Sequence, residues 1–76
     1  MIEYLVQLEE GCWIAYWSGD PGRTMSLELA KPFETPQAAA GSLRYAKRFR
    51  GFENAKIVVR LEDGTLVDYS EYAVKS

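Results

Sequence analysis

The stretch from residue 35 to residue 51 is the one segment with the pattern of a helix, and strand-like sequence lies on both sides of it. Thr35 stands at the position of an N-cap, and Pro36 follows at the first helical position, where its missing N–H costs nothing. Gly51 stands where a left-handed residue commonly ends a helix. A single helix among strands requires a fold in which the strands pack against that helix.

The predicted helix has one face of small and apolar residues and one basic face. At about 100° per residue, the first face gathers Ala38, Ala39, Ser42, Leu43, Tyr45, Ala46 and Phe49. The second face carries Arg44, Lys47 and Arg48. We therefore expect the first face to pack on a sheet and the second to face solvent.

Five segments have the alternating or aromatic-rich pattern of strands, and they are residues 2–8, 12–17, 25–30, 55–61 and 65–69. Residues 9–11 predict a hairpin turn between the first two, and Asp63-Gly64 predicts another between the last two. Pro32 is expected to end the third strand, and the tail, residues 70–76, to pair weakly or fray.

The predicted element order is β-β-β-α-β-β, which indicates an α+β fold with a single antiparallel sheet and one helix packed across one face. A chain of 76 residues allows one domain, residues 1–76. One helix leaves the opposite sheet face bare. Neighbouring strand residues point to opposite faces, so that bare face is expected to carry either Trp13 and Trp17 or Ile14 and Tyr16.

Charge is distributed unevenly along a chain whose formal net charge is −2. Residues 1–35 carry two basic and six acidic side chains, residues 36–60 six basic and one acidic, and residues 61–76 one basic and four acidic. A protein that is acidic in total is therefore expected to present a local basic surface.

The candidate residues of that basic surface are Arg44, Lys47, Arg48, Arg50, Lys56 and Arg60. Four of them fall within seven positions with no acidic residue between them, which suits a phosphate backbone or an acidic partner. The alternative is a solvated helix face whose cations complement the helix dipole.

The candidate aromatic surface consists of Trp13, Tyr16 and Trp17. Such side chains anchor protein partners or stack on nucleic-acid bases. The alternative is core filling, and one of the two alternating sets is expected to be core.

A turn-rich loop, residues 18–23, is a candidate anion site made of Ser18, Gly19, Asp20, Gly22 and Arg23. Gly-rich turns expose successive N–H groups, and an Arg forks onto phosphate or carboxylate. The alternative is a tight connection in which Asp20 caps the turn and Arg23 pairs with Asp20 or Glu28.

No catalytic or metal-binding motif is found in the sequence. Cys12 has no His to pair with, and the carboxylates lie in expected turns, so we expect no enzymatic activity, no metal and no cofactor. A lone cysteine, and the absence of an apolar stretch near the ~20 residues of a membrane span, predict a soluble cytoplasmic protein that does not enter membranes.

Residues 39–69, AAGSLRYAKRFRGFENAKIVVRLEDGTLVDY, place a helix before a strand and a tight hairpin, and this layout resembles that of some anti-CRISPR proteins. Residues 17–24, WSGDPGRT, resemble a feature of small bacteriophage and prophage proteins. The resemblance implies a stoichiometric inhibitor or adaptor that binds a host protein or nucleoprotein complex in the bacterial cytoplasm. Two other hypotheses are nucleic-acid binding through the basic helix face and capture of a small phosphorylated ligand by the 18–23 loop. A homodimer that covers the bare sheet face is a further possibility.

Overall fold

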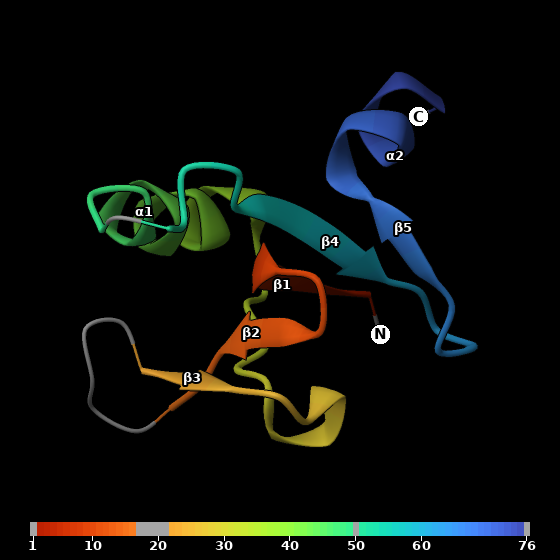
Figure 1. Cartoon of the computed structure of the whole chain (residues 1–76). Coiled ribbons are helices and arrows are strands. Elements are labelled where there is room, and N and C mark those ends of the chain that lie inside the picture. The colour runs from red at the N-terminus through yellow and green to blue at the C-terminus, as the bar shows by residue number, and fades with distance from the viewer. Residues whose placement is uncertain (1, 17–21, 50, 76) are drawn as a thin grey trace.

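A five-stranded antiparallel sheet is the framework of the structure, a computed structural model that describes residues 2–16, 22–49 and 51–75 (Figure 1). Its strands are β1 (Glu3–Glu9), β2 (Cys12–Ile14), β3 (Arg23–Thr24), β4 (Lys56–Arg60) and β5 (Leu66–Asp68). Their order across the sheet is β3-β2-β1-β4-β5, so β1 is central and pairs with both β2 and β4. The predicted α+β class and antiparallel sheet are confirmed.

Helix α1 (Pro36–Ala46) begins where the sequence predicts and ends earlier. The side chain of Thr35 accepts a hydrogen bond from the Ala38 N–H at 3.2 Å, and Pro36 occupies the first helical position. The predicted end at Gly51 is wrong, because Lys47 is the C-cap and tight turns follow it. Gly51 does have the expected left-handed conformation, with φ of 97°, but it lies in the loop beyond those turns.

Both predicted hairpin turns are present. Gly11 has φ of 76° in the turn between β1 and β2, which glycine adopts at no steric cost. Gly64 has φ of 91° in the turn between β4 and β5, where the Asp63 carboxylate accepts the Thr65 N–H at 2.9 Å. Side chain to backbone bonds of this kind explain why Asp-Gly favours tight turns.

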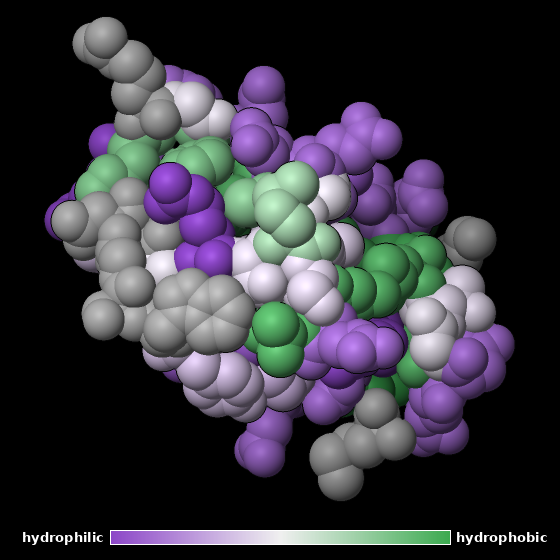
Figure 2. All heavy atoms as spheres, turned by 60° about the horizontal axis from the view of Figure 1, so that its bottom comes forward, coloured by the Kyte–Doolittle hydropathy of each residue, from purple (hydrophilic) through white to green (hydrophobic). Residues whose placement is uncertain are grey.

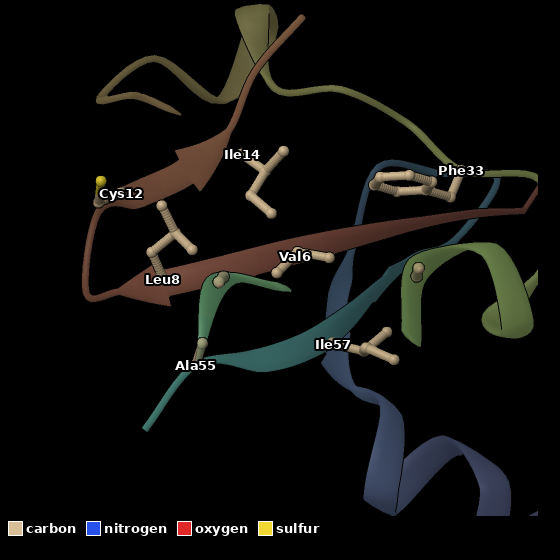
Figure 3. Close-up of a cluster of buried hydrophobic side chains, with 9 residues drawn as sticks. Val6, Leu8, Cys12, Ile14, Phe33, Ala55 and Ile57 are labelled. Carbon is tan, nitrogen blue, oxygen red and sulfur yellow. The ribbon is translucent and has the colours of Figure 1, made fainter. Parts of the chain in front are cut away.

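The main core lies between the sheet and α1. Its buried residues are Val6, Leu8, Cys12, Ile14, Phe33, Ala39, Ala46, Ala55 and Ile57, and Figure 3 shows seven of them labelled on one side of β1, β2 and β4. Ala39 and Ala46 are fully buried and lie seven positions apart, so they mark the centre of the packing face of α1. Small residues at that centre let the helix backbone approach the sheet.

Two residues assigned to the packing face of the helix are in fact exposed. Ala38 faces solvent, and Tyr45 is 46% exposed. The packing face centres on Ala39 and Ala46, and Tyr45 lies about 100° around the helix from Ala46, at the margin of that face.

The predicted third strand is wrong. Only Arg23 and Thr24 pair in β3, and the hydroxyl of Thr24 accepts the Ser26 N–H at 3.0 Å as the chain turns off the sheet. The chain then forms a short 3₁₀ helix, η1 (Leu27–Leu29). Alternation of apolar and polar residues therefore does not make this segment a strand, because it lies across the sheet instead of pairing at its edge.

The sheet face opposite α1 is not bare, because the η1 segment covers part of it. Leu27 and Ala30 pack there on Leu5, Trp13 and Val58 in a second small core. Val58, which neighbours the main-core residue Ile57 in β4, is buried on this opposite face. Figure 2, seen from the side of β3, shows hydrophobic surface interrupted by hydrophilic side chains.

The chain then passes around the end of the sheet to reach α1. Ala30 bridges to Ala15, and the Lys31 N–H donates to the Ile14 carbonyl at 2.8 Å. Phe33 and Tyr4 exchange two backbone hydrogen bonds of 2.8 and 2.9 Å. Ala30 belongs to the second core and Phe33 to the main core, so these few residues link the two sheet faces.

The tail forms helix α2 (Tyr69–Lys75), so the expectation of a weak strand or frayed end is wrong. Tyr69 packs edge-to-face on Tyr4, with ring centroids 6.0 Å apart. Burial, and then the neighbouring Tyr72 and Tyr69, raise the pKa of Tyr4. In the described part of the chain, no helix has the length and apolar character needed to cross a bilayer.

The burial of Trp13 leads to a stability prediction. Trp13→Ala is expected to lower the free energy of unfolding by about 3–5 kcal/mol, the cost of removing a large aromatic from a core. Tyr16→Ala is the matched control, since Tyr16 is 69% exposed, and it should cost less than about 1 kcal/mol. Urea unfolding followed by circular dichroism measures both, and equal losses would contradict the placement of Trp13 in the second core.

Asp63 leads to a prediction of pH dependence. The Thr65 backbone N–H, and then the Thr65 side chain, lower the pKa of Asp63 from its ordinary value of 3.8. A carboxylate with a lower pKa in the folded state stabilises folding above its unfolded pKa, and this contribution is lost as the pH falls through the folded pKa. The thermal stability lost in Asp63→Ala should therefore shrink as the pH is lowered below about 4.

The control for this prediction is Asp63→Asn, which keeps an acceptor oxygen and does not titrate. Its stability relative to Asp63→Ala should not vary with pH over the same range. A constant difference between Asp63→Ala and the parent protein across the acid range would show that the turn carboxylate does not contribute in this way.

Candidate functional site

The last turn of α1 and the turn after it carry a group of cations and aromatics that we call the basic end, made of Arg44, Tyr45, Lys47, Arg48 and Phe49. Its three cations are exposed, and no ion pair joins any of them to another residue within the described ranges. Backbone hydrogen bonds of 3.0 to 3.2 Å, donated by Lys47, Arg48 and Phe49, hold the turns in place. The structure thus brings together three of the six predicted basic residues.

Tyr45 and Phe49 form an edge-to-face pair beside these cations, with ring centroids 5.2 Å apart. Both residues were assigned to the packing face of the helix from the sequence, so this aromatic pair was not predicted as part of the surface. The sequence feature that identifies this exposed pair is Ala39 with Ala46. Small residues seven positions apart lie on the same side of a helix and mark the side of α1 that packs on the sheet.

The members of the basic end follow one another around the helix. With about 100° per residue, the order from one flank of α1 to the other is Lys47, Arg44, Arg48 and Tyr45. The band begins at Lys47 beside a groove and ends at the aromatic pair. Its surface is therefore positive in the middle and apolar at both sides.

That groove lies between α1 and α2, with β4 running between the two helices in Figure 1. It has a volume of about 220 Å³, and its lining is mostly apolar. Residues from both helices, β4 and its neighbours line it: Leu43, Lys47, Ala55, Lys56, Ile57, Asp68, Tyr69 and Ser70.

Lys56 and Arg60 do not extend the basic end. Their register in β4 pairs them with Gln7 and Glu3 and sets them out of step with Ile57, which packs toward α1, although Lys56, at the start of the strand, also borders the groove. Each is also neutralised, since Lys56 lies 3.0 Å from Asp68, and the Arg60 guanidinium donates to Glu3 with its Nε at 3.0 Å. Lys56 and Arg60 therefore lie apart from the basic end, and Arg50 lies outside the described residues.

The predicted aromatic surface is not assembled. Trp13 is 7% exposed beneath the η1 segment, so its assignment to a surface is wrong. Tyr16 is exposed, and the Lys31 ammonium lies 5.8 Å from its ring centroid. Trp17 lies outside the described residues.

The predicted anion loop is described only at its end. Ser18, Gly19 and Asp20 lie outside the described residues. The Gly22 carbonyl accepts the Ala15 N–H at 2.9 Å, and the Arg23 guanidinium lies 5.7 Å from the centroid of the Phe52 ring. Arg23 is thus directed at the segment that follows α1.

Cys12 and the potential metal ligands are not gathered into a metal site in the described part of the chain. Cys12 is buried, and burial raises the pKa of its thiol, which opposes the reactive thiolate form. The described residues hold no group of three or more His, Cys, Asp or Glu placed to bind a metal ion.

A wider depression of about 570 Å³ lies near the β1–β2 turn and is lined in part by Glu9 and Glu10. Both glutamates are exposed, and they make this depression acidic on one side. Lys56 also lines this depression, so its lining carries both signs of charge.

Comparison with known proteins adds no assignment. No protein-family model, curated protein or solved structure gives a significant match to this chain. The basic end and the adjoining groove are the features from which a function has to be argued.

Proposed function

We propose that this chain is a non-enzymatic interaction module, a stoichiometric inhibitor or adaptor that uses the basic end to bind an acidic surface of a host protein or nucleoprotein complex. The observation that carries the proposal is the contrast between two sets of cations. Lys56 and Arg60 are paired with carboxylates, whereas Arg44, Lys47 and Arg48 have no ion pair within the described ranges. Charge complementarity across an interface directs association and selects partners.

The aromatic pair supports a protein as the direct partner. Tyr45 is 46% exposed next to three cations, and Tyr and Arg are enriched among the residues that dominate binding energy at protein interfaces. The basic end is also small, with three described cations on a chain of net charge −2. Nucleic-acid binders commonly make about 6–10 phosphate contacts, which this surface does not supply by itself.

Nucleic acid is the second candidate, because the aromatic pair stands next to three exposed cations and this combination also suits a single strand. Bases stack on exposed aromatic rings, and such stacking next to cations is typical of single-strand binding. The two candidates differ in a measurable way, because nucleic-acid binding falls steeply as salt rises and does not survive nuclease.

Neutralising the basic end is expected to abolish partner binding without unfolding the protein. The variant Arg44→Gln/Lys47→Gln/Arg48→Gln removes three charges, each worth up to about 1 kcal/mol in an exposed ion pair with the partner, so affinity should fall by up to about a hundredfold. Affinity capture of the tagged protein from bacterial lysate, with and without nuclease, measures the loss by mass spectrometry.

The charge-matched control is Gln37→Glu/Ala38→Glu/Ala73→Glu, which lowers the net charge equally at exposed positions outside the basic end. A protein captured by the parent and the control, lost in the neutralised variant and unaffected by nuclease supports the proposal. Equal capture by all three forms rejects the basic end as the binding surface. Capture that disappears with nuclease favours the nucleic-acid candidate.

A further inference from the structure

We infer that the groove between α1 and α2 is an anchor pocket for one large apolar side chain, carried by an acidic segment of the protein partner. This inference rests on the proposed function and specifies the chemistry of the partner. It joins two features that lie side by side, an apolar groove and Lys47, which has no ion pair among the described residues.

The size and lining of the groove favour a single side chain. Its volume of about 220 Å³ is below the ~300–1,000 Å³ of pockets that enclose small-molecule ligands. Its apolar lining comes from Leu43, Ala55, Ile57 and Tyr69. An apolar group that enters it removes surface from water on both partners, which is the main favourable term in association.

The charge at the groove favours a carboxylate next to that apolar group. Lys47 lines the groove and is also the first member of the basic end. Leu43 and Lys47 lie four positions apart and share one flank of α1, so a single helical turn supplies an apolar wall and a cation. Lys56 and Asp68 line the groove as well, and each neutralises the other. Lys47 is therefore the groove lysine available to an incoming carboxylate in the described structure.

The groove is formed before any partner arrives. Its α2 wall is fixed by the edge-to-face contact of Tyr69 with Tyr4 on β1, and its floor by Ile57 in the main core. A preformed site avoids the cost of ordering its own walls on binding. A buried apolar anchor surrounded by a polar rim that excludes water is the usual arrangement of a binding hot spot.

Two labelled peptides test the inference by fluorescence anisotropy. Both consist of Glu and Asp around one central residue, which is Trp in the first peptide and Ala in the second. The Trp peptide should bind the parent protein at least about tenfold more tightly, because burial of a large apolar side chain contributes more than a tenfold gain in affinity. Equal affinities, or no binding of the Trp peptide, would overturn the inference.

Substitutions on α2 locate the effect. Ser70 is exposed and lines the groove, so Ser70→Phe should fill it and remove the advantage of the Trp peptide while binding of the Ala peptide is retained. Retained binding of the Ala peptide also shows that the variant is folded. Ala73→Phe is the matched control, because Ala73 is exposed on the same helix and does not line the groove. A Trp advantage that persists in Ser70→Phe overturns the inference.

The remaining outcomes separate this inference from the proposed function. The variant Arg44→Gln/Lys47→Gln/Arg48→Gln should weaken the binding of both peptides. If it does so while the two peptides bind the parent protein with equal affinity, the basic end is supported as a binding surface and the groove is rejected as an anchor pocket. Light scattering measures the oligomeric state, because a second copy of this chain is the competing occupant of the groove. A dimer that dissociates in Ser70→Phe but not in Ala73→Phe would assign the groove to self-association and overturn the inference.

Discussion

The structure depends on the pairing of β1 with β4, which brings residues 3–7 beside residues 56–60 at the centre of the sheet. Five consecutive residue pairs form this ladder, from Glu3 with Arg60 to Gln7 with Lys56. It closes a long loop, and it is stable because both of its faces are buried: Val6 and Ile57 belong to the main core, while Leu5 and Val58 belong to the second core. Helix α1 packs on these same two strands, so the position of the basic end follows from this ladder.

Two elements that were not predicted from the sequence, η1 and α2, determine which surfaces of the protein are exposed. The η1 segment buries Trp13, which removes it from the candidate aromatic surface. Helix α2 stands beside β4 and turns an open part of the sheet into a groove next to Lys47. The candidate binding surface therefore lies on the helix side of the sheet, where a single cationic and aromatic helix end meets an apolar hollow.

Predictions from the sequence were reliable where structure is set by neighbouring residues. The start of α1 depends on Thr35 and Pro36, and the β4–β5 turn on Asp63 and Gly64, so each could be predicted from a few positions. The basic end was predicted in part, because the spacing of Arg44, Lys47 and Arg48 places them away from the packing face. The paths of residues 25–30 and the tail depend on distant contacts, with Leu5 and Tyr4 respectively, and periodicity carries no information about these.

Residues 30–33 pass around the end of the sheet and connect the two cores. Ala30 is anchored in one and Phe33 in the other, with a backbone that bonds to Ile14 and Tyr4 on the way. The segment that covers one sheet face cannot detach without displacing residues that cover the opposite face. The molecule is therefore expected to open as one cooperative unit. A partner bound to α1 would stabilise the whole folded domain. It would therefore raise the resistance to mechanical unfolding and slow amide hydrogen exchange on the opposite face of the sheet, which the partner does not contact.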